Sequence, residues 1–199
     1  KQSDYSDFVL NEQAYLTSAG AQSDKAYWLK RFDGFNASLD LPTDYTRPAE
    51  QSFAGSNQYF TIEANELAQL KSLSQQSKVS AFAWLLANFY VLLNKLSHNT
   101  DIAVGIPCAG RSKSEFNALV GMCANTSVMR QQLDESMSFA TLAQQTMQQF
   151  LRDLEHQYFP FEAYLSDLAL TQDRSRNPLF DVMFIYEKAD QRQFTLPGV

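Results

Sequence analysis

Few residues in this sequence have the types and spacing that catalysis or ligand binding requires. Residues 105–112, Gly-Ile-Pro-Cys-Ala-Gly-Arg-Ser, follow an apolar stretch and have the glycine spacing of a phosphate-binding P-loop. Arg111, however, stands where such loops carry a lysine that binds phosphate. Pro107 removes a backbone N–H that a phosphate cradle would use. The spacing therefore does not predict a nucleotide site.

The two histidines give no sign of a catalytic base. His98 follows a long apolar helix pattern, where a cation near the helix C-terminus is mildly favourable, so a surface position is expected. His156 precedes an aromatic-proline corner. Asn125 lies among apolar residues, and its carboxamide is either buried and satisfied by the backbone or directed toward a ligand. The sequence contains no GxSxG or HExxH pattern, no metal-spaced His/Cys set and no close carboxylate pair, so no metal site is predicted.

Composition excludes several classes of protein. The 199 residues are 45% hydrophobic and 13% aromatic, which is typical of a folded globular chain. The net charge of −6 and the lack of a Lys/Arg run argue against nucleic-acid binding. The longest apolar run, residues 81–93, is broken by Asn88 and falls short of the roughly 20 residues that span a membrane. Cys108 and Cys123 have no CxxC spacing, so we expect free thiols buried on strands rather than a disulfide, which favours a cytoplasmic setting.

The elements that must position these residues follow from hydrophobic periodicity. Helices are expected over residues 5–16, 24–32, from an N-cap at Asn65 through Leu73, from an N-cap at Ser80 to residue 96, and over residues 138–155. Strands are expected over residues 58–63, 101–106, 126–133 and 179–186. Residues 39–48, with two prolines, predict an irregular crossing segment. This order predicts an α/β fold, a mixed sheet with flanking helices.

Two long runs near the C-terminus are the least generic part of the sequence. Residues 156–162 read His-Gln-Tyr-Phe-Pro-Phe-Glu, and Pro160 should end one helix and allow another to begin. Residues 173–184 contain Asp-Arg-Ser-Arg-Asn-Pro-Leu-Phe, where Pro178 marks a turn before an apolar strand. In their order and spacing, these runs resemble the HQ-x-x-PFE and D-x-SR-x-PLF motifs of condensation domains from nonribosomal peptide synthetases.

Other segments carry the same resemblance. Residues 105–111 resemble the family's GxPxxGR segment, and residues 39–48 resemble its LPTD-x-x-RP connection. Residues 120–130 resemble its IGxFVNTxxxR motif, with Cys and Ala in place of a bulkier aromatic residue and a Val. Residues 5–9 resemble the family's Tyr-x-Asp-Phe/Tyr-x-x-Trp motif, but Leu10 and Asn11 stand where a Trp is expected.

The resemblance implies one lobe of the two-lobed chloramphenicol acetyltransferase-like fold. Residues 1–199 would form the C-terminal lobe, and the N-terminal lobe, with the catalytic histidine of an HHxxxDG motif, would be absent from this chain. The two lobes would enclose a tunnel in which an acyl or peptidyl thioester reacts with an aminoacyl amine. No cofactor would bind directly, since both substrates would arrive on 4'-phosphopantetheine arms.

The resemblance also implies partners and residue roles. The partners would be the N-terminal lobe, donor and acceptor carrier proteins and a neighbouring adenylation domain, with no nucleic acid or membrane. Asn125 and Thr126 would line the tunnel, and Arg111 would form an ion pair at the lobe junction. The expected architectural residues are His156, Pro160, Phe161, Glu162, Asp173, Arg176 and Pro178. An epimerisation, cyclisation or acyltransferase domain, or a non-catalytic lobe that docks carrier proteins, remains an alternative.

Overall fold

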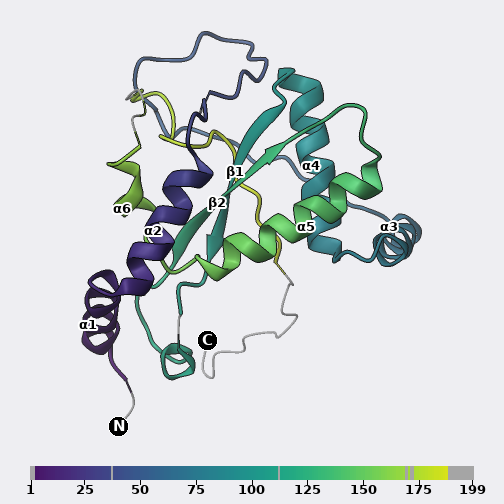
Figure 1. The fold of residues 1–199 in the computed structure, drawn as a ribbon. Helices are drawn as coiled ribbons and strands as arrows, with labels where there is room; N and C mark the ends of the chain where they lie inside the picture. The colour runs from purple at the N-terminus through teal and green to yellow at the C-terminus, as the bar shows by residue number, and fades with distance from the viewer. Residues whose placement is uncertain (1–2, 37, 112, 169, 171–172, 188–199) are drawn as a thin grey trace, which may run out of the picture.

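An antiparallel pair of strands lies at the centre of the chain (Figure 1). The computed structural model describes residues 3–36, 38–111, 113–168, 170 and 173–187. Strand β1 (Asp101–Cys108) pairs with β2 (Asn125–Gln132), from Asp101 opposite Gln132 to Cys108 opposite Asn125. β1 is buried almost along its whole length, because apolar clusters cover both faces of the pair.

The segment after Pro178 runs alongside the free edge of β1. The Gly105 N–H donates to Val182 O at 3.0 Å, and the Phe184 N–H donates to Gly105 O at 2.9 Å, in the parallel sense. The strand expected over residues 179–186 is therefore reduced to a single bridge. Glycine is required at position 105 because an added Cβ would lie 2.6 Å from the Phe180 ring.

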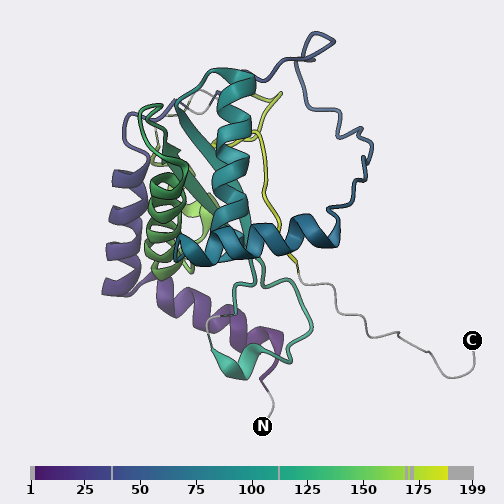
Figure 2. The ribbon, with the colours of Figure 1, turned by 90° about the vertical axis from the view of Figure 1, so that its right-hand side faces the viewer.

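Helices surround this centre on several sides. They are α1 (Tyr5–Leu16), α2 (Ala19–Arg31), α3 (Ala64–Gln76), α4 (Ala81–Ser97), α5 (Phe139–Glu155) and the short α6 (Phe161–Leu165), with a 3-10 turn η1 (Ser114–Phe116). Helix α5 packs against both α4 and β2, α4 also packs on β1, and α2 packs against α6 (Figures 1 and 2). Mixed α/β architecture with flanking helices is confirmed.

Most helix boundaries agree with the capping residues in the sequence. The hydroxyl of Ser80 accepts the Ala83 N–H at 3.1 Å and that of Ser138 accepts the Thr141 N–H at 3.2 Å, as expected of N-caps. The N-cap predicted at Asn65 is wrong. Helix α3 begins at Ala64, because the Glu63 N–H is satisfied by the side chain of Glu66, three residues later. Helix α2 begins before residue 24, at a cap provided by Ser18.

The strand predicted over residues 58–63 is wrong. These residues form no regular element, and the Tyr59 and Phe60 side chains are 88% and 87% exposed. Figure 2 shows the connection between α2 and α3 looping out on one side of the molecule. The irregular segment at residues 39–48 is confirmed, since no regular element forms there.

Two details of the core differ from the sequence pattern. On α5, Leu151 belongs to the apolar stripe of the sequence but is half exposed, whereas Asp153 is completely buried. Cys108 and Cys123 are both buried free thiols, as expected, but Cys123 lies in the loop before β2 rather than on a strand.

In the described part of the chain no single helix has the length and apolar character to cross a membrane. Only the bent pair α3 and α4, taken together, has the length and composition of a membrane span.

Candidate functional site

Motif segments that are distant in the sequence meet at the end of the strand pair where Cys108 faces Asn125. Helix α1 contacts the loop between the strands, because the Tyr5 hydroxyl donates to Met122 O at 2.8 Å. The Phe8 ring packs edge-to-face on Phe116, with centroids 5.4 Å apart. We call this region the motif cluster. It joins α1, the loop at residues 109–124 and the corner between α5 and α6.

Asn125 holds the strand end to that corner. Its amide nitrogen donates to Gln157 O at 2.8 Å and to Phe159 O at 3.1 Å. Its oxygen accepts the Thr126 N–H at 2.9 Å and the Phe161 N–H at 3.3 Å. Of the two alternatives left open by the sequence, these bonds favour a carboxamide satisfied by the backbone. The expected role of Asn125 and Thr126 in lining a tunnel stays a prediction.

His156 is part of the same corner. Its Nδ1 lies 2.6 Å from Asp24 Oδ1, its ring stacks on Tyr27 at 3.8 Å, and its backbone oxygen accepts the Trp28 indole N–H. These contacts fix α2 against the end of α5. These contacts are structural, and the architectural role expected of His156 stays a prediction.

The residues after His156 build the start of α6. Pro160 is the N-cap and Phe161 is buried, while Glu162 is exposed in the first turn, where a negative charge favours the helix N-terminus. Pro160 thus separates α5 from α6, as its position in the sequence indicated.

The second C-terminal run ties the chain to the irregular crossing segment. Asp173 accepts the Ser175 N–H at 2.8 Å, and hydrogen bonding to Ser175 lowers the pKa of Asp173. Arg176 donates to Asp181 Oδ2 at 2.7 Å and to Leu39 O at 3.3 Å. Pro178 lies in a bend, and the segment that follows it runs beside β1. This arrangement anchors the segment beside β1.

Arg111 lies within the motif cluster. Its side chain is partly buried and donates to Phe116 O, which fastens the loop after β1. Gly110 has φ +65°, and a Cβ there would lie 1.6 Å from Cys123 O, so this position requires glycine. Ser112, the last residue of the P-loop-like spacing, is outside the described residues. The predicted ion pair of Arg111 with a second lobe stays a prediction.

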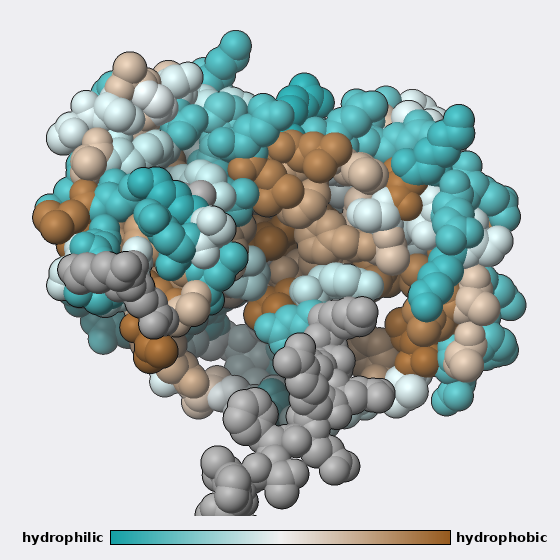
Figure 3. Space-filling view, turned by 90° about the horizontal axis from the view of Figure 1, so that it is seen from below, coloured by the Kyte–Doolittle hydropathy of each residue, from teal (hydrophilic) through white to brown (hydrophobic). Residues whose placement is uncertain are grey.

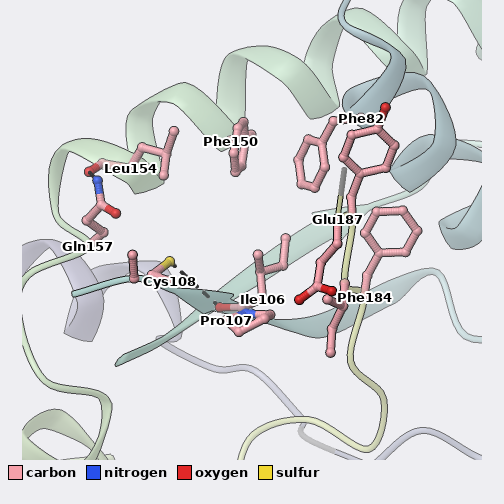
Figure 4. A pocket seen from close by; sticks show the side chains of 12 residues that line it. Phe82, Ile106, Pro107, Cys108, Phe150, Leu154, Gln157, Phe184 and Glu187 are labelled. Atoms are coloured by element: carbon pink, nitrogen blue, oxygen red, sulfur yellow. Dashed lines mark hydrogen bonds between the residues drawn. The ribbon is translucent and has the colours of Figure 1, made fainter. Parts of the chain in front are cut away.

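An apolar groove of about 460 Å³ opens beside the motif cluster (Figure 4). Phe82 and Phe150 form one wall, Ile106 and Cys108 come from β1, and residues 184–187 close the other side. Burial raises the pKa of the Cys108 thiol, so the sulfur remains protonated at neutral pH. Figure 3 views the molecule from below and shows apolar side chains gathered in a hollow of that face. The groove is mostly apolar, and Glu187 is the one acidic side chain among its lining residues.

Sequence patterns missed a buried polar cluster between α2 and α5. Asp153 accepts hydrogen bonds from the Tyr27 hydroxyl and from Gln149, and Arg31 Nε lies 3.4 Å from its Oδ1. Burial raises the pKa of Asp153, while Arg31 opposes the shift. The only available signal was an acidic residue among the apolar positions of an amphipathic helix.

Among the described residues, no cluster of His, Cys, Asp and Glu could hold a metal ion.

Comparison with known proteins identifies the family. The family model for condensation domains matches residues 1–197. This chain belongs to the condensation domain family. Tyrocidine synthase 3 of Brevibacillus parabrevis is 38% identical over 98% of this chain, and bacitracin synthase 1 of Bacillus licheniformis is 32% identical over 98%. The chain spans only 3% and 4% of the length of these relatives.

Solved structures agree with the chloramphenicol acetyltransferase-like fold of condensation domains. Holo-AB3403, a four-domain nonribosomal peptide synthetase bound to AMP and glycine, has a TM-score of 0.81 at 26% identity, over 84% of this chain and 13% of that one. The X-domain from teicoplanin biosynthesis has a TM-score of 0.83 at 20% identity, over 90% of this chain and 41% of that one.

Proposed function

We propose that this chain is the C-terminal lobe of a condensation domain that forms amide bonds in nonribosomal peptide synthesis. The observation that carries the proposal is the motif cluster, in which four of the six segments that resemble the family's motifs meet beside an apolar groove. The family match and the synthetases among the relatives support the same context. Coverage of about two-fifths of the X-domain chain is in keeping with one lobe of a longer domain.

In the proposed reaction, the amine of an aminoacyl thioester attacks the carbonyl carbon of an acyl or peptidyl thioester. A C–N bond forms, the C–S bond breaks, and the donor carrier's phosphopantetheine thiol is released. The amine proton passes to a base, which we place on the histidine motif of the missing lobe. This chain would supply one wall of the tunnel, which excludes water and holds the thioesters in contact.

The residues of the motif cluster would have positioning roles. Asn125 and Thr126, at the start of β2, would form part of the tunnel wall. Arg111 would form an ion pair with an acidic residue of the other lobe. Donor and acceptor carrier proteins and an adenylation domain would be the neighbours. No cofactor would bind to this chain itself.

The test is amide formation between two carrier proteins loaded with acyl and aminoacyl groups, followed by mass spectrometry. We expect product from the complete domain and none from the 199-residue chain alone. Addition of the N-terminal lobe in trans, or its fusion, should be required for activity. Amide formation by this chain alone at a rate comparable to the complete domain would place the base within residues 1–199 and contradict the proposal.

The same assay separates the alternative reactions. Because Asn125-Thr126 matches the plain condensation motif, we expect a linear amide with unchanged stereochemistry. A heterocyclic product, or inversion without a new amide, would assign the domain to cyclisation or epimerisation instead.

A further inference from the structure

A second hollow lies between the loop after β1 and helix α1. We call it the α1 pocket; its volume is about 290 Å³. The rings of Phe8, Tyr15 and Tyr158 line it, together with Asn11 in the middle of α1 and Gly110 of the loop. Three different segments of the motif cluster therefore contribute to one aromatic-walled space.

Small residues occupy two positions near this space. Asn11 is a small residue where the related motif carries a Trp, and Cys123 is a small residue where the related motif carries an aromatic ring. Phe8 connects the two positions, because it lines the α1 pocket and packs in one buried cluster with Cys123 and Phe116. The small side chains at positions 11 and 123 therefore lie on either side of Phe8, next to the open space.

The chemistry of the lining favours an uncharged, flat occupant. The Tyr15 hydroxyl already donates to Asp24, and burial raises its pKa, so Tyr15 offers a neutral ring to the pocket. Glu12 and Lys113 also border the space, but both are exposed, so their charges remain in water. Aromatic walls pack well against a further ring. An apolar cavity of about 150 Å³ is known to hold benzene, so the volume is sufficient for one or two fused rings.

We propose that the α1 pocket binds a neutral aromatic group of phenyl or indole size. Within the proposed condensation function, on which this part rests, the group is the aromatic side chain of a carrier-bound substrate. The location agrees, since Tyr158 belongs to the corner held by Asn125 and Gly110 adjoins Arg111. The pocket would then favour aromatic over small aliphatic substrates.

Indole titration, followed by saturation-transfer NMR or calorimetry, tests the pocket without any reaction. Asn11→Trp fills the space from within, and Gln13→Trp places the same ring on the exposed face of α1 as a matched control. We expect the wild type and Gln13→Trp to bind indole with the same Kd, and Asn11→Trp to bind it about tenfold more weakly or worse. Absence of indole binding to the wild type, or equal binding to Asn11→Trp, would overturn the proposal.

A second variant covers the case in which Asn11→Trp does not fold. Tyr158 is 38% exposed, so Tyr158→Ala should leave the fold intact while removing one wall. We expect weaker indole binding with an unchanged circular dichroism spectrum. Indole affinity equal to that of the wild type would count against the pocket.

The source of the ring is tested in the complete domain, with phenylalanyl and alanyl acceptors and donors compared in separate reactions. Asn11→Trp should lower the ratio of kcat/KM for the aromatic substrate to kcat/KM for the alanyl substrate, whereas Gln13→Trp should leave this ratio unchanged. An equal effect on both, or none on either, overturns the substrate assignment. If the wild type forms no amide from any pair, the proposed function fails, whereas the indole result still decides the pocket.

Discussion

Among single residues, Asn125 makes the most complete set of contacts in the motif cluster. Its carboxamide makes four hydrogen bonds to backbone groups, so Asn125→Ala should leave buried groups unpaired at a cost of about 1–3 kcal/mol. For a chain of this size, the melting temperature should fall by roughly 2–4 °C per kcal/mol. Thermal unfolding of Asn125→Ala beside Asn117→Ala, an exposed asparagine in the same loop region, measures the effect.

The same variant separates the two roles of Asn125 in the complete domain. Normal turnover per folded molecule, together with the loss of stability, is the expected result of a structural carboxamide. Slow amide formation at an unchanged melting temperature would instead show that Asn125 acts on the substrate.

Asp153 gives a prediction about pH. Because burial raises its pKa above the ordinary value of 3.8, the folded protein binds this proton more tightly than the unfolded chain. The contribution of Asp153 to stability should therefore fall as the pH rises from about 4 through the folded pKa. Asp153→Asn keeps the shape and cannot titrate. The free energy of unfolding in urea should be measured for the wild type and for Asp153→Asn. The wild-type value minus the variant value should be larger at pH 4 than at pH 7. A larger difference at pH 7 would mean that pairing with Arg31 outweighs burial.

At the scale of elements, the loop after β1 depends on glycine. Gly110→Ala should be strongly destabilising, because the new Cβ would overlap Cys123 O and the backbone has φ +65°. Gly20→Ala is the matched control within α2, where the nearest atom would be Ser18 Oγ at an ordinary 3.5 Å. Because Gly20 is exposed in the first turn of α2, that substitution should change the free energy of unfolding by less than about 0.5 kcal/mol. Equal melting temperatures for the two variants would contradict the close approach of the loop to Cys123.

Helices were predictable from the sequence because their evidence is local. Ser80 and Ser138 sit directly before apolar stripes, and both cap the helices that follow. Strands depend on partners that a local pattern does not reveal. Residues 58–63 have the side chains of a strand but no neighbour among the described residues, and residues 179–186 meet β1 only around Gly105.

The candidate site was predictable in part. The motif runs located Asn125, His156 and Arg111, but their meeting with α1 is a tertiary event, carried by contacts such as the Tyr5 bond to Met122 O across more than one hundred residues. The Asp153 cluster was missed for a similar reason. Hydrophobic periodicity assigns an acidic residue to the solvent side, whereas here α2 supplies hydrogen-bonding partners that permit its burial.

At the scale of the whole molecule, Arg111 tests whether a second lobe docks on the motif cluster. In this chain it donates only to Phe116 O among the described residues, so Arg111→Ala should cost about 1–2 kcal/mol. In the complete domain, the same substitution would leave the acidic partner of the proposed ion pair buried without a counter-charge, which should cost about 3–5 kcal/mol. Chemical denaturation of both forms gives the difference. Equal losses in the two forms would show that no partner meets Arg111.

The extended connection between α2 and α3 has a consequence for handling the protein. Residues 44–62 are almost wholly exposed and lack regular structure, and their links to the core are few, such as Arg47 to Ser175 O and the Arg174–Glu50 pair. A protease needs such an exposed, extended stretch to fit its active site. Chymotrypsin, which cuts after aromatic residues, should therefore nick the native chain first at Tyr45, Phe53, Tyr59 or Phe60. The two fragments should then elute together on gel filtration, because α2 and α6 remain packed across the cut.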